Sequence, residues 1–146
     1  MTSRHSTLQG ILLGVAVPGV ATLLSLPLGC KAPQTMVSAP GVPASQGTVE
    51  ATIGDKGNTN ISIRVKHLAP PSKMAPDATV YVVWLQPPDA EKQNIGALVL
   101  NENLEGSLDT VSAHTRFQIS VTPEPSGSGS QPTHDPVFTA EVIGSK

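Results

Sequence analysis

Apolar and polar residues alternate with a period of two through most of the chain after residue 47. The clearest example is Ile61, Ile63 and Val65, which alternate with polar or charged neighbours. Such alternation predicts a β-strand with one buried face and one solvated face. The chain has 14 Pro and 13 Gly among its 146 residues, and both residue types favour turns. The pattern therefore predicts short strands joined by turns.

Seven segments carry this strand pattern, and no segment shows a convincing helical period. The expected strands cover residues 47–53, 61–66, 79–85, 95–100, 104–111, 116–122 and 137–143. Their number and spacing predict an all-β fold, an immunoglobulin-like antiparallel sandwich of about seven strands. A partly open barrel is the alternative, because a sequence cannot show whether a sheet closes. Residues 79–85 are apolar on both faces, so we expect a central strand, and this Trp84-bearing strand should supply the centre of the core.

Charge is absent from a long segment near the start of the chain. No Lys, Arg, Asp or Glu lies between Arg4 and Lys31, and an apolar stretch begins at Gly10. A short positive segment followed by an apolar one is typical of a secretory signal peptide. The stretch ends at Cys30, the only cysteine in the chain, so an intramolecular disulfide is excluded.

The residues Leu26-Pro27-Leu28-Gly29-Cys30 resemble the lipobox of a bacterial lipoprotein signal, in which an aliphatic residue, a small residue and Gly or Ala precede the cysteine. Pro27 stands where that family usually has leucine. The resemblance implies signal cleavage between Gly29 and Cys30, lipidation of the Cys30 thiol, and acyl chains that anchor the protein in a membrane facing the periplasm or the exterior. In an envelope with two membranes, Lys31 after the cysteine implies the outer membrane.

Two alternatives to lipidation stay open. Residues 6–29 are uncharged, and a stretch of about 20 apolar residues can span a bilayer as an uncleaved anchor. The other alternative is ordinary export, with the signal removed and Cys30 left as a buried or free thiol.

The expected chain organisation has three parts. Residues 1–29 are the signal peptide, residues 30–46 are the lipidated cysteine with a Pro-rich tether, and residues 47–146 are the β-sandwich domain. The segment between Lys31 and Gln46 has three prolines and no periodicity, a composition that favours a flexible spacer. The alternative is a loop packed on the domain, for which only Met36, Val37 and Val42 are available as anchors.

The second half of the chain also resembles the extracytoplasmic domain of anti-sigma-K factors. The matching features are the tryptophan-bearing strand at residues 80–85, the glycine-containing strand at 95–98, the strand ending in Glu-Pro at 117–125, and the Gly/Ser/Pro loop at 126–132. The resemblance implies a sandwich. The sigma-binding segment and His/Cys motif of that family would precede a membrane span. Only five residues precede the uncharged run that begins at Ser6, so anti-sigma activity is not implied.

The sequence contains no recognisable catalytic or metal-binding constellation. His67, His114 and His134 lie far apart, without the close spacing of metal ligands. No Gly-x-Ser-x-Gly elbow and no phosphate-binding loop occurs. The segment 55–60 has calcium-ligand residue types but lacks the spacing of a calcium loop, so we interpret it as a hairpin turn. We therefore expect no enzyme activity, no metal and no cofactor.

Composition argues against nucleic-acid binding and leaves two kinds of partner. Nine Lys plus Arg against eleven Asp plus Glu give a net charge of −2, so the basic excess that phosphates require is missing. The expected partners are a lipid membrane and an unidentified protein, with the protein contacted by loops on the rigid sandwich. The candidate interaction residues are Gln86, Pro87, Pro88, Ser126, Gly127, Ser128, Gly129 and His134.

These expectations combine into one functional hypothesis and one alternative. The hypothesis is a membrane-anchored envelope lipoprotein that presents a small β-sandwich as a structural or protein-interaction module. The alternative is a sensory or regulatory accessory domain related to the extracytoplasmic domains of anti-sigma factors.

Overall fold

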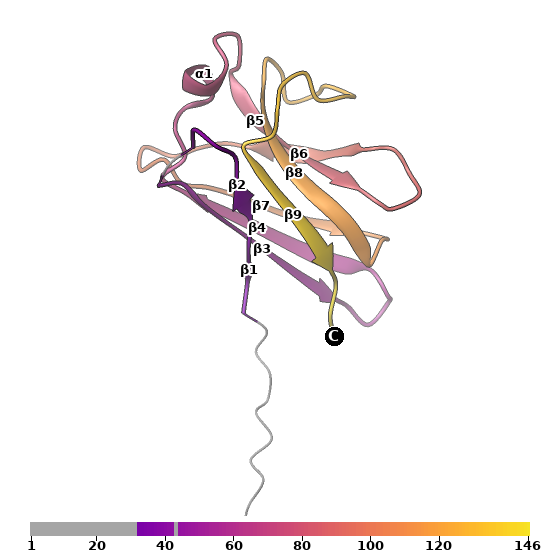
Figure 1. Cartoon of the computed structure of the whole chain (residues 1–146). Helices are drawn as coiled ribbons and strands as arrows, with labels where there is room; N and C mark the ends of the chain where they lie inside the picture. Colours follow the sequence, from indigo (N-terminus) through magenta and orange to yellow (C-terminus); the bar gives the residue numbers. More distant parts are fainter. Residues whose placement is uncertain (1–31, 43) are drawn as a thin grey trace, which may run out of the picture. The chain divides into compact units, whose positions relative to one another are not determined.

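A computed structural model describes residues 32–42 and 44–146, which form an almost entirely β structure (Figure 1). The long strands occur where the sequence alternation predicts them, and a single helical turn begins at Pro71. The elements are β1 (Gln34–Thr35), β2 (Val37–Ser38), β3 (Gln46–Ile53), β4 (Thr59–Lys66), α1 (Pro71–Met74), β5 (Val80–Gln86), β6 (Gln93–Leu98), β7 (Gly106–Ser112), β8 (Arg116–Glu124) and β9 (Phe138–Ile143).

The strands form two antiparallel sheets that pack as a sandwich, which confirms the predicted fold class. One sheet has the order β1-β3-β4-β7 and the other has the order β2-β9-β8-β5-β6. Of the seven long strands, the first, second and fifth form one sheet, and the third, fourth, sixth and seventh form the other. This exchange of strands between sheets is the Greek-key connectivity of immunoglobulin-like sandwiches, here with the fourth strand beside the third.

The alternating residues of β4 show how the pattern builds the core. Ile61, Ile63 and Val65 are buried between the sheets, and Arg64 and Lys66 are exposed. The same inward parity would bury His67, but its φ of 55° turns the chain at the end of β4. His67 is therefore exposed, and Leu68 occupies the buried position instead.

Strand β5 is buried on both faces, as its apolar sequence predicts, but its two faces serve different purposes. Tyr81, Val83 and Leu85 belong to the core between the sheets. Val82 and Trp84 are also fully buried, on the outer face of the five-stranded sheet. The strand thus contributes to the core as predicted, through the face that carries Tyr81. Trp84 itself does not belong to that core. The alternation of side chains along a strand places it on the opposite face.

Residues 32–42 pack against the sandwich, so the expectation of a flexible tether is wrong for this segment. β1 pairs with β3, and β2 pairs with β9, so the chain crosses from one sheet to the other at Met36. Met36 and Val42 are 3% and 5% exposed and join the hydrophobic core. Two buried apolar anchors and hydrogen bonds to strands of both sheets offset the entropy of ordering this segment.

The strand directions give the sandwich two distinct ends. The turns 54–58, 87–92 and 113–115 and the C-terminal residues 144–146 lie at one end, here named the hairpin pole. The segments 39–45, 67–79, 99–105 and 125–137 lie at the other end, here named the loop pole. In Figure 1, α1 at the loop pole lies at the upper left and the C-terminus lies at the bottom.

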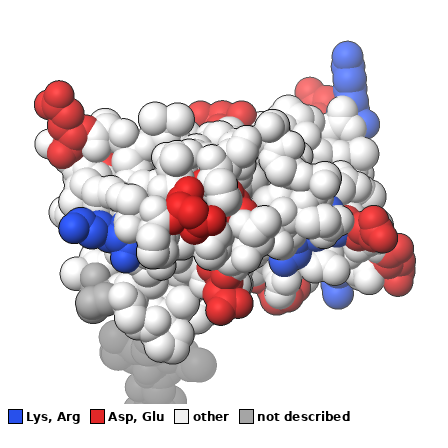
Figure 2. Space-filling model, turned by 90° about the horizontal axis from the view of Figure 1, so that it is seen from above, with Lys and Arg blue, Asp and Glu red and all other residues white. Residues whose placement is uncertain are grey.

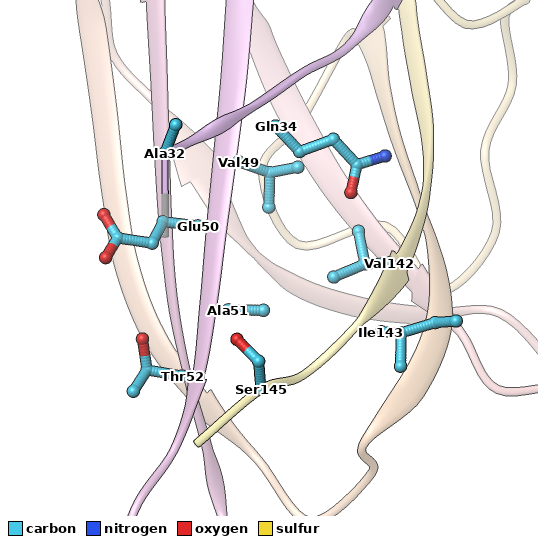
Figure 3. A pocket seen from close by; sticks show the side chains of 9 residues that line it. All are labelled: Ala32, Gln34, Val49, Glu50, Ala51, Thr52, Val142, Ile143 and Ser145. Carbon is cyan, nitrogen blue, oxygen red and sulfur yellow. The ribbon is translucent and has the colours of Figure 1, made fainter. Parts of the chain in front are cut away.

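The first described residues lie toward the hairpin pole, beside the end of the chain. Ala32 and Ser145 line the same small cleft between β3 and β9 (Figure 3). Ser145 is held there because its carbonyl accepts a 2.8 Å hydrogen bond from the Ile53 amide. The cleft has about 30 Å³ of free volume, enough for one or two water molecules and too small for an organic ligand.

Candidate functional site

The loop after β8, residues 125–136, lies as a strap over the outer face of the five-stranded sheet. The Asn94 side-chain amide on β6 donates to the carbonyls of Gly127 and Gly129, both at 2.9 Å. A Cβ atom at Gly129 would lie 3.9 Å from the Trp84 ring, and one at Gly127 would lie 3.3 Å from the Ala97 side chain. These contacts fix the strap to the sheet.

Trp84 explains why the strap lies where it does. Its indole faces away from the core and is fully buried. The indole nitrogen must also find an acceptor, because an unpaired buried donor is costly. Nε1 donates to Oγ1 of Thr122 on the neighbouring strand β8 at 2.7 Å. The strap contributes to the cover of this ring, since a Cβ atom at Gly129 would lie in van der Waals contact with its edge.

The carboxylate of Glu124 connects the strap to the sheet. Its carboxylate is buried, with the residue only 3% exposed. It accepts a 2.5 Å hydrogen bond from the Thr122 hydroxyl, hydrogen bonds from the Thr133 amide at 3.0 and 3.1 Å, and one from the Thr133 hydroxyl. Burial alone would raise the pKa of Glu124, but the hydrogen bonds from Thr122, Thr133 and the nearby backbone outweigh it and lower the pKa.

His134 links the strap to the segment that follows α1. Its Nδ1 lies 3.0 Å from the Thr133 hydroxyl oxygen, and its Nε2 lies 3.1 Å from Oδ1 of Asp77. The Thr133 hydroxyl gives its proton to Glu124, so it can only accept from Nδ1, and the Asp77 carboxylate can only accept from Nε2.

The predicted interaction residues belong to two different segments of the structure. Ser126, Ser128 and His134 belong to the strap, which leaves β8 at the loop pole. Gln86 and the two prolines after it lie at the hairpin pole, where Pro87 is buried and Pro88 is exposed. They line an open groove of about 380 Å³ together with Arg116, Phe117, Gln118 and Glu141.

The loop pole holds a second groove that sequence reasoning missed. About 270 Å³ of free volume lies among apolar side chains from three segments, including Pro70, Val80, Leu100 and Leu104. Val99 stands at its rim and is 76% exposed. An apolar groove beside an exposed apolar side chain is the kind of surface that binds proteins. No sequence pattern indicates it, because these residues meet only after folding.

The predicted lipid site lies outside the described residues. Cys30, Gly29 and the apolar run before them are in the segment 1–31. Among residues 32–42 and 44–146, no helix is long and apolar enough to cross a membrane, and no cluster of three or more His, Cys, Asp or Glu side chains is arranged to hold a metal ion.

The charged side chains of the described domain form no continuous patch on the face that Figure 2 shows. Figure 2, which looks at the molecule from the side of α1, shows acidic and basic groups scattered over a mostly uncharged surface. The clearest ion pair lies on the outer face of the four-stranded sheet, where Arg64 contacts Asp109 at 2.8 Å. Hydrogen bonds from Ser62 and Arg64 lower the pKa of Asp109. Both partners are exposed, so the pair contributes little stability.

Sequence reasoning also missed the polar network of Thr122, Glu124 and Thr133. The only signal was a glutamate at the end of an apolar strand, flanked by two prolines. No family model, curated protein or solved structure matches this chain.

Proposed function

We propose that the protein is a lipid-anchored lipoprotein of the cell envelope whose β-sandwich serves as a protein-interaction or structural module. One observation carries the proposal: the only cysteine follows Leu28-Gly29 at the end of a charge-free apolar segment. A lone cysteine at this position has no intramolecular disulfide partner and stands where a lipobox has its lipidated residue. The acyl chains added there would attach the domain stably to a membrane, since one chain alone binds reversibly.

The described domain supports this proposal through the placement of its loops. The first described residue, Ala32, lies toward the hairpin pole, so the loop pole is free to face a partner. The apolar groove near Val99 and Leu104 is the candidate contact surface there. The strap beside this groove is fixed to the sheet, so less conformational entropy is lost when a partner binds.

The anchor is tested by replacing Cys30 with alanine in the full chain. We expect the variant to lose incorporation of labelled palmitate and to leave the membrane fraction after signal processing. Ser25→Ala, in the same apolar segment, is the matched control and should keep both properties. Unchanged palmitate label in Cys30→Ala would refute the lipoprotein assignment, and unlabelled but membrane-retained protein would favour the uncleaved anchor.

The interaction role is tested by photo-crosslinking from two exposed valines in intact cells. Val99 is 76% exposed at the groove, and Val111 is 59% exposed on β7 away from it. We expect a discrete crosslinked protein from position 99 and none from position 111. Equal products from both positions, or none from either, would contradict the groove as the contact surface.

The alternative proposal is a sensory or regulatory accessory domain. It rests on the resemblance of residues 79–142 to the extracytoplasmic domains of anti-sigma factors. A sigma-factor gene beside the gene for this protein would favour it.

A further inference from the structure

The folded domain starts almost immediately after the proposed lipidation site. Residues 32–42 belong to the sandwich, so Lys31 alone separates Cys30 from the first described residue. Two residues of extended chain span at most about 7 Å. An eight-residue strand such as β3 is about 26 Å long. The connection is therefore much shorter than the domain and cannot hold it away from a bilayer.

The point at which the chain enters the domain decides which end faces the lipid. Gln34 pairs with Val49, and Thr35 pairs with Thr48, so β1 runs from the hairpin pole toward the loop pole. Ala32 lies before β1, near Glu50 of β3, and lines the same cleft as Ser145 (Figure 3). Met36 and Val42, buried beyond this point, fix the segment in that direction.

The charges of the two poles favour the same orientation. The loop-pole segments carry one lysine and four carboxylates, namely Lys73, Asp77, Glu102, Glu105 and Asp135. The hairpin-pole segments carry three lysines and three carboxylates, namely Lys56, Lys92, Lys146, Asp55, Asp89 and Glu91. An anionic lipid surface attracts basic residues and repels acidic ones. The loop pole is thus the less favourable end to place against it.

We propose that the sandwich rests directly on the lipid surface with its hairpin pole toward the headgroups and its loop pole away from them. This inference rests on the proposed lipidation of Cys30. It assigns the turns 54–58 and 87–92 to the membrane side, and with them the groove near Gln86. It leaves the apolar groove near Val99 as the surface open to a protein partner.

The orientation is tested with single fluorescent labels on the full, lipidated chain in phosphatidylethanolamine–phosphatidylglycerol vesicles. Lipidation consumes the thiol of the only native cysteine, so an introduced cysteine is the one labelled position. Asn58→Cys and Ala90→Cys label the hairpin pole, and Ser72→Cys and Asn103→Cys label the loop pole. All four positions are exposed and uncharged. A nitroxide on the lipid headgroups should quench the first two labels severalfold more than the last two.

Equal quenching at both poles, or stronger quenching at the loop pole, would overturn the orientation. Inserting twelve Gly/Ser residues between Lys31 and Ala32 adds a flexible span of about 20 Å and should narrow the difference between the poles. An unchanged difference in that variant would contradict the short connection as its cause. Cys30→Ala in the same assay separates the two proposals: quenching retained without the cysteine refutes the lipid anchor, whatever the orientation.

Discussion

The buried carboxylate of Glu124 makes the stability of the sandwich depend on pH. Because its pKa is lower in the folded state than the ordinary value of 4.5, the unfolded chain takes up its proton first as the pH falls. The contribution of Glu124 to the free energy of unfolding is therefore complete above about pH 5 and is lost as the pH falls through the folded pKa. We expect the urea midpoint, followed by Trp84 fluorescence, to fall as the pH is lowered below about 5.

Glu124→Gln should remove part of this pH dependence and lower stability at neutral pH. The amide group of glutamine would place a donor against the donors of Thr122 or Thr133, at a cost of about 2–4 kcal/mol. Glu91→Gln is the matched control, because Glu91 is exposed in the turn after β5. A pH profile of Glu124→Gln parallel to that of the unaltered protein would show that the carboxylate does not bind the strap as described.

Two buried threonines should respond in opposite ways to the same substitution. Among the described residues, the Thr59 hydroxyl is the buried side-chain group that has no hydrogen-bond partner, whereas the Thr122 hydroxyl joins Trp84 to Glu124. We expect Thr59→Val to raise the free energy of unfolding by about 1 kcal/mol and Thr122→Val to lower it by at least that amount. Urea unfolding of both variants at pH 7 measures the difference. A loss of stability in Thr59→Val would contradict the prediction.

At the scale of elements, alternation predicted the strands that carry their own pattern and missed those that depend on distant partners. The sequence predicts β4 because Ile61, Ile63 and Val65 are apolar, alternate with polar residues and point inward. β1 and β2 are two residues long, too short for a period, and form only because β3 and β9 offer free edges. The burial of Met36 is a property of the gap between the sheets and is therefore invisible in the sequence.

The strap shows the same limit for the candidate site. Its glycines and serines correctly predict a loop. The hydrogen bonds that hold this loop in place come from Asn94, which lies on another element. Parity correctly separates Trp84 from Tyr81 onto opposite faces of β5, yet parity cannot say which face is the inner one. The network of Thr122, Glu124 and Thr133 joins residues of β8 to a residue nine positions further along in the strap, and no motif marks it.

Asn94→Ala should loosen the strap without unfolding the sandwich. The substitution removes two hydrogen bonds to strap carbonyls and leaves the core between the sheets unchanged. We expect faster hydrogen exchange of the amides in residues 127–133 and a red shift of the Trp84 emission, because water would reach the indole more often. Asn60→Ala, exposed on the outer face of β4, should change neither signal, and unchanged exchange in Asn94→Ala would mean that other contacts fix the strap.

At the scale of the whole molecule, the position of the domain boundary decides what the anchor means. A domain that began at Gly47 would leave a long flexible connection to Cys30 and no preferred orientation on a membrane. A domain that begins at Ala32 has one entry point, near the hairpin pole, and therefore two unequal ends. The packing of residues 32–42 on the sandwich, in place of the expected flexible tether, is therefore the basis of the proposed orientation of the domain on a membrane.

This boundary predicts a large difference between two fragments. A fragment of residues 32–146 should unfold cooperatively, with the same midpoint by far-UV circular dichroism and Trp84 fluorescence. A fragment of residues 47–146 lacks Met36 and Val42, and losing a single buried side chain of this size typically costs about 1–5 kcal/mol. It also exposes edges of β3 and β9, so we expect a much lower urea midpoint or aggregation.

Met36→Ala in the longer fragment should produce part of the same loss of stability. Val37→Ala should not, because the neighbouring Val37 is 69% exposed. Equal midpoints for the two fragments would mean that residues 32–46 are a tether after all, and the orientation of the sandwich on the membrane would lose its basis.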